Sequence, residues 1–290
     1  MPSTASYLNT LTHERILLLD PNLNALRHQW LEEIRSSGAL SSSSRRTALA
    51  LLNEAQVETL STEEIDAVDS NSIASRIDHT LLKPAFASRE ISTLCSEAHT
   101  HQMGAVCVPP VAVPLAVELR ENLGASFEVV TVAGFPLGYS TSSTKAFEIR
   151  DAFQNHADEV DVVGLTSALK SGEEERYYQD LCACVAGAEG QPIKVILETA
   201  LLTIEETLFA CLLAEAAGVS SVKTSTGFST GGATLASVSL MRAVVSPHIK
   251  VKASGGIRTR EDALKMVAVG ADRLGTSSGI AILTKGEHTP

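Results

Sequence analysis

Eight short apolar runs, each followed by a stretch with helical character, recur through most of this chain and constrain its fold more than any other feature. From about residue 75 onward they are spaced about 20 to 30 residues apart, which is typical of repeated βα units around a parallel sheet. Eight such units in about 210 residues predict a compact (β/α)8 TIM barrel of the α/β class. The expected strands are Ser75–Leu82, Ala105–Pro109, Phe127–Phe135, Glu159–Gly164, Ile193–Thr199, Ser220–Ser225, Ile249–Ser254 and Arg273–Thr276.

Helix signals fall between these runs. Residues 143–155 have helical character, and Thr203 and Thr259 each precede acidic residues in the pattern of a capping box. An open doubly wound sheet is the main alternative to a barrel. That fold usually carries a glycine fingerprint after its first strand, and residues 77–81 contain no glycine, so the barrel is favoured.

The first 72 residues have a different organisation. Two helical patterns, roughly Thr12–Ser36 and Arg45–Leu60, are joined by the serine-rich residues 38–44. We expect residues 1–72 to form an N-terminal helical extension and residues 73–290 to form the barrel. The extension is expected to cap the barrel bottom or to mediate self-association.

Charge and cysteine content exclude several classes of protein. The net charge of −11 argues against nucleic acid or an anionic membrane as the main partner. No apolar run reaches the roughly 18 residues of a membrane span, and the N-terminus lacks a signal-peptide pattern. The five cysteines are scattered and predict neither a disulfide framework nor a zinc site. We therefore expect a cytoplasmic protein with no metal and no other cofactor. We also expect a homo-oligomer, a dimer or a tetramer, although the residues themselves do not give the oligomeric state.

Two lysines interrupt core-type strands near their ends. Lys223 lies in SVKTSTGF and Lys252 in KVKASGGIR, so small residues and glycines follow both. Burying an ammonium group costs several kcal/mol, and Schiff-base chemistry with a carbonyl compound is a common reason for it. An edge-strand lysine whose stem covers apolar surface is the alternative. The repetition of the pattern favours chemistry.

Polar residues on the expected strands extend this candidate site. Lys223 and Lys252 belong to neighbouring strands about 5 Å apart, where two ammonium groups at an effective dielectric of ~20 repel by roughly 3 kcal/mol. That repulsion lowers one lysine pKa by about 2 units, to near 8. Asp161, flanked by valines, is expected to relay a proton with Lys252 through water or to offset the positive pair. Asp78 and Thr80 are candidates for hydrogen-bonding a substrate hydroxyl.

Three small-residue turns follow the last three strands and predict a phosphate site. Loops at these positions of a barrel present free backbone amides to an anion, although glycines also serve plain tight turns. The turns contribute Thr226, Gly227, Gly255, Gly256, Ser277 and Ser278. Cys107, on the second strand, either faces the barrel mouth and contacts substrate, where unsaturated aldehydes can alkylate it, or packs as a small apolar residue.

Several separated motifs occur in order between residues 75 and 283: IDHTLLKP, AVCVPP, VAGFPLG, ADEVDVV, KVILETALL, VKTSTGFSTGGAT, VKASGGIRTREDA and RLGTSSG. With them the chain resembles the deoxyribose-phosphate aldolases, a family of class I aldolases with a (β/α)8 barrel. The resemblance implies that Lys223 is the Schiff-base lysine, Lys252 the second lysine that perturbs it and relays protons, and Asp161 the relay aspartate. It also implies the phosphate role of the glycine and serine turns. The implied reaction is the reversible, metal-independent cleavage of 2-deoxy-D-ribose 5-phosphate to acetaldehyde and D-glyceraldehyde 3-phosphate.

Two features depart from the family pattern. Some members end in a tail whose terminal tyrosine assists proton transfer, whereas this chain ends in KGEHTP, and the first 72 residues lie outside the common core. Another Schiff-base aldolase or transaldolase is an alternative, distinguished by the donor that supports turnover. A catalytically silent barrel that binds phosphorylated metabolites is a second alternative, and it predicts binding without release of acetaldehyde.

Overall fold

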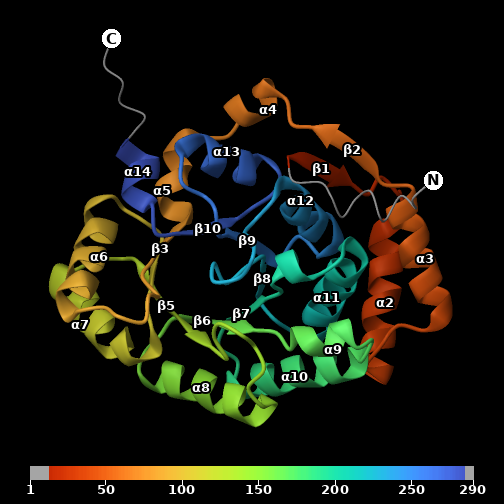
Figure 1. The fold of residues 1–290 in the computed structure, drawn as a ribbon, viewed down its shortest axis with the longest axis horizontal. Helices are drawn as coiled ribbons and strands as arrows, with labels where there is room; N and C mark the ends of the chain where they lie inside the picture. The colour runs from red at the N-terminus through yellow and green to blue at the C-terminus, as the bar shows by residue number, and fades with distance from the viewer. Residues whose placement is uncertain (1–12, 285–290) are drawn as a thin grey trace.

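A closed barrel of eight parallel strands forms the centre of the molecule, as predicted. The computed structural model describes residues 13–284, and within them strand β10 pairs with β3 to close the barrel (Figure 1). Every barrel strand lies within its expected run. The barrel strands are β3 (Ile77–Thr80), β4 (Ala105–Cys107), β5 (Glu128–Ala133), β6 (Glu159–Val163), β7 (Ile193–Ile196), β8 (Ser221–Lys223), β9 (Lys250–Ser254) and β10 (Arg273–Thr276).

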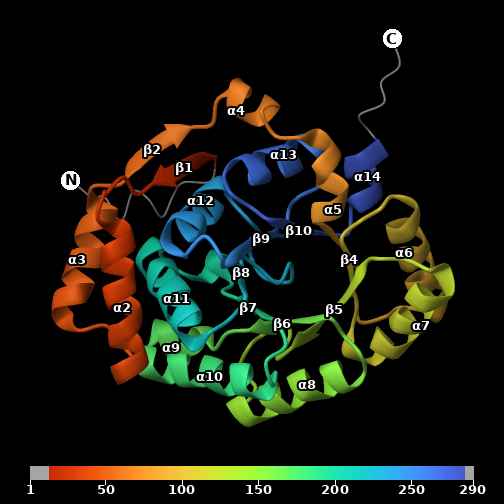
Figure 2. The ribbon, with the colours of Figure 1, turned by 180° about the vertical axis from the view of Figure 1, so that it is seen from behind.

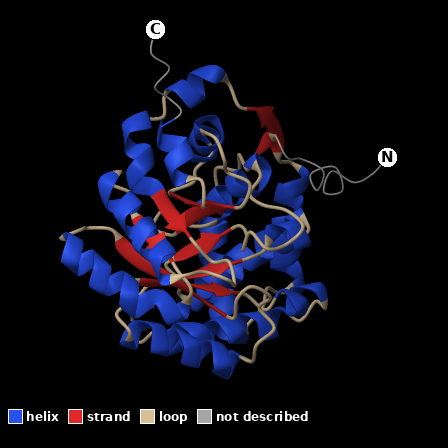
Figure 3. Cartoon of the chain, turned by 60° about the vertical axis from the view of Figure 1, so that its left-hand side comes forward, coloured by secondary structure: helices blue, strands red, loops and turns tan. Residues whose placement is uncertain are grey.

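Helices enclose this barrel on all sides (Figure 3). The capping boxes predicted at Thr203 and Thr259 are both present; for example, Thr203 Oγ1 accepts from the Glu206 N–H at 3.1 Å, while Glu206 accepts from the Thr203 N–H at 2.7 Å. The outer helices are α6 (Ser88–Thr100), α7 (Val113–Leu123), α8 (Ser142–Gln154), α9 (Thr166–Lys170), α10 (Glu174–Gly187), α11 (Ile204–Ala217), α12 (Leu235–Val244), α13 (Arg260–Ala268) and α14 (Gly279–Thr284). Short 3-10 turns are η1 (Ser70–Ser72), η2 (Pro110–Ala112) and η3 (Thr199–Leu201).

The barrel interior is divided into an apolar and a charged side. On the apolar side, β4 and β5 carry a small hydrophobic cluster that is separate from the main core. It is composed of Ala105, Cys107, Val130 and Val132. On the other side the inward positions carry lysines and carboxylates. Because successive residues of a strand point to opposite faces, the flanking valines and isoleucines pack outward against the helices. The charged side is therefore the part of the interior that can carry chemistry.

The N-terminal segment is only partly helical. The expectation of two long helices is wrong at the start of the first helix and at the end of the second, where the chain forms strands instead. The helices present are α2 (Leu23–Ser37) and α3 (Ser42–Asn53). Strands β1 (Glu14–Leu17) and β2 (Gln56–Thr59) flank them and pair in antiparallel fashion (Figure 2). Residue 12 of the expected first helix lies outside the described residues. The short helices α4 (Thr62–Asp66) and α5 (Ile73–Arg76) lead into the barrel.

Long-range packing explains the two strands. The backbone N–H of Ile16 donates to Ser239 Oγ of α12 at 2.8 Å, and the Ile16 side chain is fully buried. Four-residue strands gain little from local preference, so contacts of this kind decide their conformation. Helix α2 packs against α11 through an apolar face that includes Trp30 and Ile34. The segment thus covers the outside of α11 and α12, rather than capping the barrel bottom as one of the two expectations held.

Candidate active site

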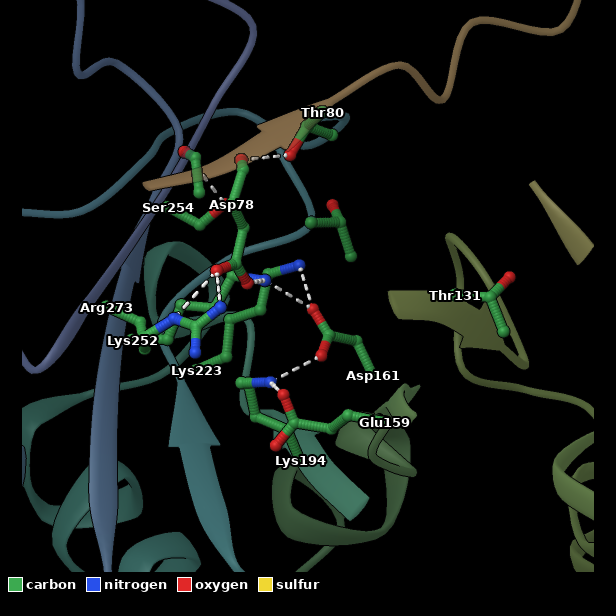
Figure 4. Close-up of polar contacts among 12 residues, drawn as sticks. Asp78, Thr80, Thr131, Glu159, Asp161, Lys194, Lys223, Lys252, Ser254 and Arg273 are labelled. Atoms are coloured by element: carbon green, nitrogen blue, oxygen red, sulfur yellow. Dashed lines mark hydrogen bonds and ion pairs between the residues drawn. The ribbon is translucent and has the colours of Figure 1, made fainter. Parts of the chain in front are cut away.

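A single carboxylate, Asp161, joins the two lysines singled out by the sequence. Lys223 Nζ and Lys252 Nζ each lie 2.8 Å from Asp161 Oδ2 (Figure 4). All three side chains are buried, and the register of β8 and β9 places Lys223 directly beside Lys252. The predicted proximity of the two ammonium groups is therefore present in the structure, with one shared oxygen between them.

The surroundings shift the pKa values of the two lysines in opposite directions. Burial, aided by the positive charge of Lys252, lowers the pKa of Lys223 even though Asp161 opposes the shift. Burial also acts against charge on Lys252, but the carboxylates of Asp161 and Asp78 outweigh it and raise the pKa of Lys252. The direction predicted for one lysine is thus found at Lys223, although burial and not charge repulsion is the larger cause. Lys223 is the better nucleophile of the pair, because only the neutral amine attacks a carbonyl.

Lys194, which the sequence interpretation missed, is a third lysine in the cluster. Its Nζ lies 2.8 Å from Asp161 Oδ1 and also pairs with Glu159. Together the three ammonium groups hold the pKa of the Asp161 carboxyl well below its usual range, although burial by itself raises it. Lys194 interrupts the apolar run IKVI much as Lys223 interrupts its own run, so the same signal was available. Lys194 lacks the small residues that directly follow Lys223 and Lys252, and those residues are what distinguishes the two lysines in the sequence.

Asp78 faces Lys252 in the barrel interior, where its side chain is completely buried. Its Oδ2 forms an ion pair with Lys252 Nζ, while its Oδ1 accepts from Arg273 Nε at 2.8 Å and Nη2 at 2.5 Å. The carboxylate is completely buried, yet Lys252 and Arg273 lower its pKa to about 2 against the effect of burial. Asp78 is therefore held as an anion by two cations. It does not line the pocket at the carboxyl ends of the barrel strands.

A pocket of about 420 Å³ opens at the carboxyl ends of the barrel strands, next to the lysines. Ser254 of β9 lies in its wall, two residues beyond Lys252, and Thr80 of β3 lies two residues beyond Asp78. Since side chains two apart on a strand share a face, the charged cluster lies one inward layer below the pocket. The sequence-predicted residues that line it are Thr80, Thr226, Gly227, Gly255, Gly256, Ser277 and Ser278.

The glycines of this pocket adopt a backbone conformation that other residues rarely take. Gly255 and Gly256 both have φ of +83°, and Gly227 has φ of +84°. This conformation allows the loop after β9 to turn sharply at the pocket edge. The cations Lys83 and Arg258 are also in the lining. Backbone turns and two cations around a concave surface fit an anionic group such as phosphate.

Two of the predicted contact residues are already engaged within the protein. The Thr226 hydroxyl donates to Glu198 Oε2 at 2.5 Å and accepts from the Phe228 N–H at 3.1 Å. Cys107 is fully buried in the apolar interior cluster, and burial raises the pKa of its thiol to about 11. Cys107 does not line the pocket, so the geometry favours the packing interpretation over a reactive thiol at the mouth.

Groups that suggest metal or membrane binding are not found in the part of the chain that the structure describes. Between residues 13 and 284 no three His, Cys, Asp or Glu side chains cluster so as to hold a metal ion. Over the same residues no helix has the length and apolar character needed to cross a bilayer. The charged side chains of the barrel interior are instead paired with one another.

A closed (β/α)8 barrel with a buried lysine of lowered pKa beside a pocket suited to an anion defines a class I aldolase. Comparison with known proteins agrees. The model of the DeoC/LacD family of aldolases matches residues 73–285, and the chain belongs to that family.

The matches to individual relatives extend over nearly the whole length of each relative. A deoxyribose-phosphate aldolase of Listeria monocytogenes serotype 4b is 51% identical over 213 residues, which is 73% of this chain and 95% of the relative. The tetrameric deoxyribose phosphate aldolase from Aeropyrum pernix superimposes with a TM-score of 0.71 at 32% identity, covering 79% of this chain and 99% of that one. The aldolase QR15 gives a TM-score of 0.70 at 37% identity, with coverage of 76% and 96%.

Proposed function

We propose that this protein is a deoxyribose-phosphate aldolase, which reversibly cleaves 2-deoxy-D-ribose 5-phosphate to acetaldehyde and D-glyceraldehyde 3-phosphate through a Schiff base. The observation that carries the proposal is the pairing of Lys223 and Lys252 on one carboxylate oxygen, 2.8 Å from each, with a glycine-lined pocket one layer above. The relatives of about 50% identity that bear this name support the choice of substrate.

Lys223 is the proposed nucleophile. Its neutral amine attacks the C1 aldehyde of the open-chain sugar, and a proton moves from nitrogen to oxygen to give a carbinolamine. Burial lowers the Lys223 pKa and so increases the fraction of neutral amine at neutral pH. Asp161 accepts from Lys223 in the resting site and fixes the direction of its chain.

Lys252 is the proposed acid and base, because it stays protonated in the resting site. Its proton leaves with the carbinolamine hydroxyl as water, and the iminium forms. Neutral Lys252 then takes the proton of the C3 hydroxyl, directly or through a water molecule, as the C2–C3 bond breaks and its electron pair forms the enamine. Lys252 returns that proton to the enamine carbon. Hydrolysis of the resulting iminium releases acetaldehyde and the free Lys223 amine, and the proton that hydrolysis sets free returns to Lys252, which restores the resting site.

Asp161 has an electrostatic role in this scheme. Its low pKa makes it a weak base, so it serves the relay by staying ionised between the two lysines and stabilising whichever one is cationic. The phosphate of the substrate is proposed to bind at Gly227, Gly255 and Gly256, together with Ser277 and Ser278 of the same lining. Thr80 is the proposed hydroxyl contact in the same lining. Thr226 also lies in the lining, with its hydroxyl held by Glu198, whereas Asp78 and Cys107 do not line the pocket.

Borohydride trapping tests the proposal. Reduction in the presence of deoxyribose 5-phosphate is expected to add the mass of the reduced adduct at Lys223, and turnover is expected to release acetaldehyde. A label on another lysine contradicts the assignment of the nucleophile. Phosphate binding without any release of acetaldehyde supports the catalytically silent barrel instead.

We also propose that the working unit is a homo-oligomer, a dimer or a tetramer, located in the cytoplasm, with residues 1–72 as an extension on a barrel of residues 73–290. Support comes from the tetrameric relative of Aeropyrum pernix and from the start of the family match at residue 73. The mass of the full chain in solution tests the assembly: a monomer at micromolar concentration contradicts it. The tail that lacks the tyrosine of some family members comprises residues 285–290, which lie outside the described residues.

A further inference from the structure

Asp161 does not distinguish the two lysines of the site. Its Oδ2 lies 2.8 Å from Lys223 Nζ and 2.8 Å from Lys252 Nζ, and both side chains are buried. A shared carboxylate of this kind stabilises a proton on either amine. Some other group must therefore decide which lysine stays charged and which can become neutral.

Asp78 is the group that differs between them. Its Oδ2 pairs with Lys252, whereas Lys223 pairs with Asp161 alone among the ion pairs of the described residues. Asp78 belongs to β3 and Lys252 to β9, and strand β10 runs between the two. Gly275 of β10 makes the contact possible, because a Cβ there would lie 2.9 Å from Lys252 Cε. The absence of a side chain at Gly275 lets the lysine chain cross to Asp78.

Arg273 holds Asp78 in place and ionised. Two of its nitrogens donate to Asp78 Oδ1, at 2.8 and 2.5 Å, and its Nη1 lies 3.0 Å from Glu128. A completely buried carboxylate with a single cation beside it can take the proton of that cation and form a neutral pair. Arginine does not release its proton in proteins, so its presence prevents this outcome.

We propose that Arg273 is a positioning residue that decides the division of charge in the site: by keeping Asp78 an anion it keeps Lys252 protonated, and Lys223 is left as the lysine that loses its proton. This inference rests on the proposed Schiff-base function. Neither the sequence motifs nor the comparisons assign a role to Arg273. The opposite pKa directions of Lys223 and Lys252 agree with it.

The other charged and titratable groups around the pair do not provide this distinction. Lys194 and the Cys107 thiol act on the site from β7 and β4, but Lys194 pairs with Asp161 and Glu159, and burial keeps the thiol protonated. The groups that act on Lys252 are Asp78 from β3, Cys107 from β4, Asp161 from β6, Lys194 from β7, Lys223 from β8 and, through Asp78, Arg273 from β10.

The pH profile of kcat/KM tests the proposal, with Arg273→Met as the main variant. Loss of Arg273 lets Lys252 become neutral, which removes a positive charge beside Lys223 and raises the Lys223 pKa. The ascending limb of kcat/KM for cleavage of deoxyribose 5-phosphate is expected to move to higher pH by about one unit or more. Near pH 7 that shift lowers kcat/KM about tenfold or more, and the deficit closes at alkaline pH. A purely structural role lowers kcat/KM by one factor at every pH.

Three further variants make the result decisive. Arg273→Lys keeps a cation beside Asp78. In this variant the ascending limb of kcat/KM is expected to lie between its positions in Arg273→Met and in the wild type. Glu128→Gln removes only the outer partner of Arg273 and is the matched control, with an unchanged limb. If Arg273→Met does not fold, Asp78→Asn carries the test and is expected to shift the limb in the same direction.

A limb that coincides with the wild type in folded Arg273→Met, or in Asp78→Asn when the arginine variant is unfolded, overturns the proposal. The same holds if Arg273→Lys and Arg273→Met behave identically across the pH range. Failure of the proposed function is separately visible, because the wild type itself would then show neither release of acetaldehyde nor a trapped adduct.

Discussion

Asp161→Asn is the substitution whose consequence follows most directly from the structure. The amide keeps the shape of the side chain but removes the charge that three ammonium groups share at 2.8 Å each. Lys194 keeps Glu159 as a partner, and Lys252 keeps Asp78. Only Lys223 loses its carboxylate altogether, so the variant contains one orphaned buried charge.

The size of the effect has a lower estimate and a ceiling. Breaking a buried ion pair from one side costs about 3 to 5 kcal/mol. Lys223 can escape that cost by losing its proton, which at pH 7 costs about 1.4 kcal/mol for each of roughly 3.4 units below a normal lysine pKa, or about 5 kcal/mol. Because burial already lowers the Lys223 pKa in the wild type, part of this cost is present there. We therefore expect the free energy of unfolding to fall by about 3 kcal/mol near pH 7.

The dependence on pH has a definite sign. In the variant, folded Lys223 binds its proton more weakly than the unfolded chain does, so stability rises with pH up to the unfolded lysine pKa near 10.4. The deficit relative to the wild type is expected to shrink by up to about 1.4 kcal/mol per pH unit. In the wild type the depressed pKa of Asp161 acts in another window: its stabilisation is present above about pH 4 and is lost as the pH falls further.

Urea unfolding followed by circular dichroism, near pH 7 and near pH 9.5, measures both quantities. Glu261→Gln is the matched control: Glu261 pairs with Lys265 at an exposed site, and we expect no measurable loss. A deficit under about 1 kcal/mol near pH 7, or one that stays constant over this pH range, would refute the reasoning.

Three further predictions concern single residues. Lys252→Met is expected to fold and bind phosphate but to lose about 10²- to 10⁴-fold in kcat, measured by acetaldehyde release, because it removes the proposed acid and base; full turnover contradicts that role. Gly256→Ala places a side chain at φ of +83°, and we expect KM for deoxyribose 5-phosphate to rise severalfold with an unchanged trapping rate for acetaldehyde alone. Cys107, with a thiol pKa of about 11, is expected to resist iodoacetamide at pH 8 until the protein unfolds, as followed by mass spectrometry; prompt labelling in the native state contradicts its burial.

Burial of a lysine alone does not identify the site. Lys145, in helix α8, is fully buried and lies 2.8 Å from Asp180 of α10, which is also buried. Its two helices lie outside the barrel, so this pair ties them together there, with the Lys145 chain packed beside Gly134, just after the end of β5. What separates Lys223 and Lys252 from Lys145 is their place in β-type runs followed by glycines, and that pattern is local in the sequence.

The sequence by itself determined the barrel, because the alternation of apolar runs with helical stretches, and the caps at Thr203 and Thr259, are properties of neighbouring residues. It also determined that Lys223, Lys252 and the glycine turns share one end of the barrel, because parallel strands bring their carboxyl ends together. Only the tertiary structure decided that Asp161 bridges three lysines, that Asp78 faces Lys252 across Gly275, and that residues 14–17 pair with residues 56–59. These contacts join residues far apart in the chain. They depend on strand register and on the reach of the side chains, and the conformational preferences of neighbouring residues determine neither of these.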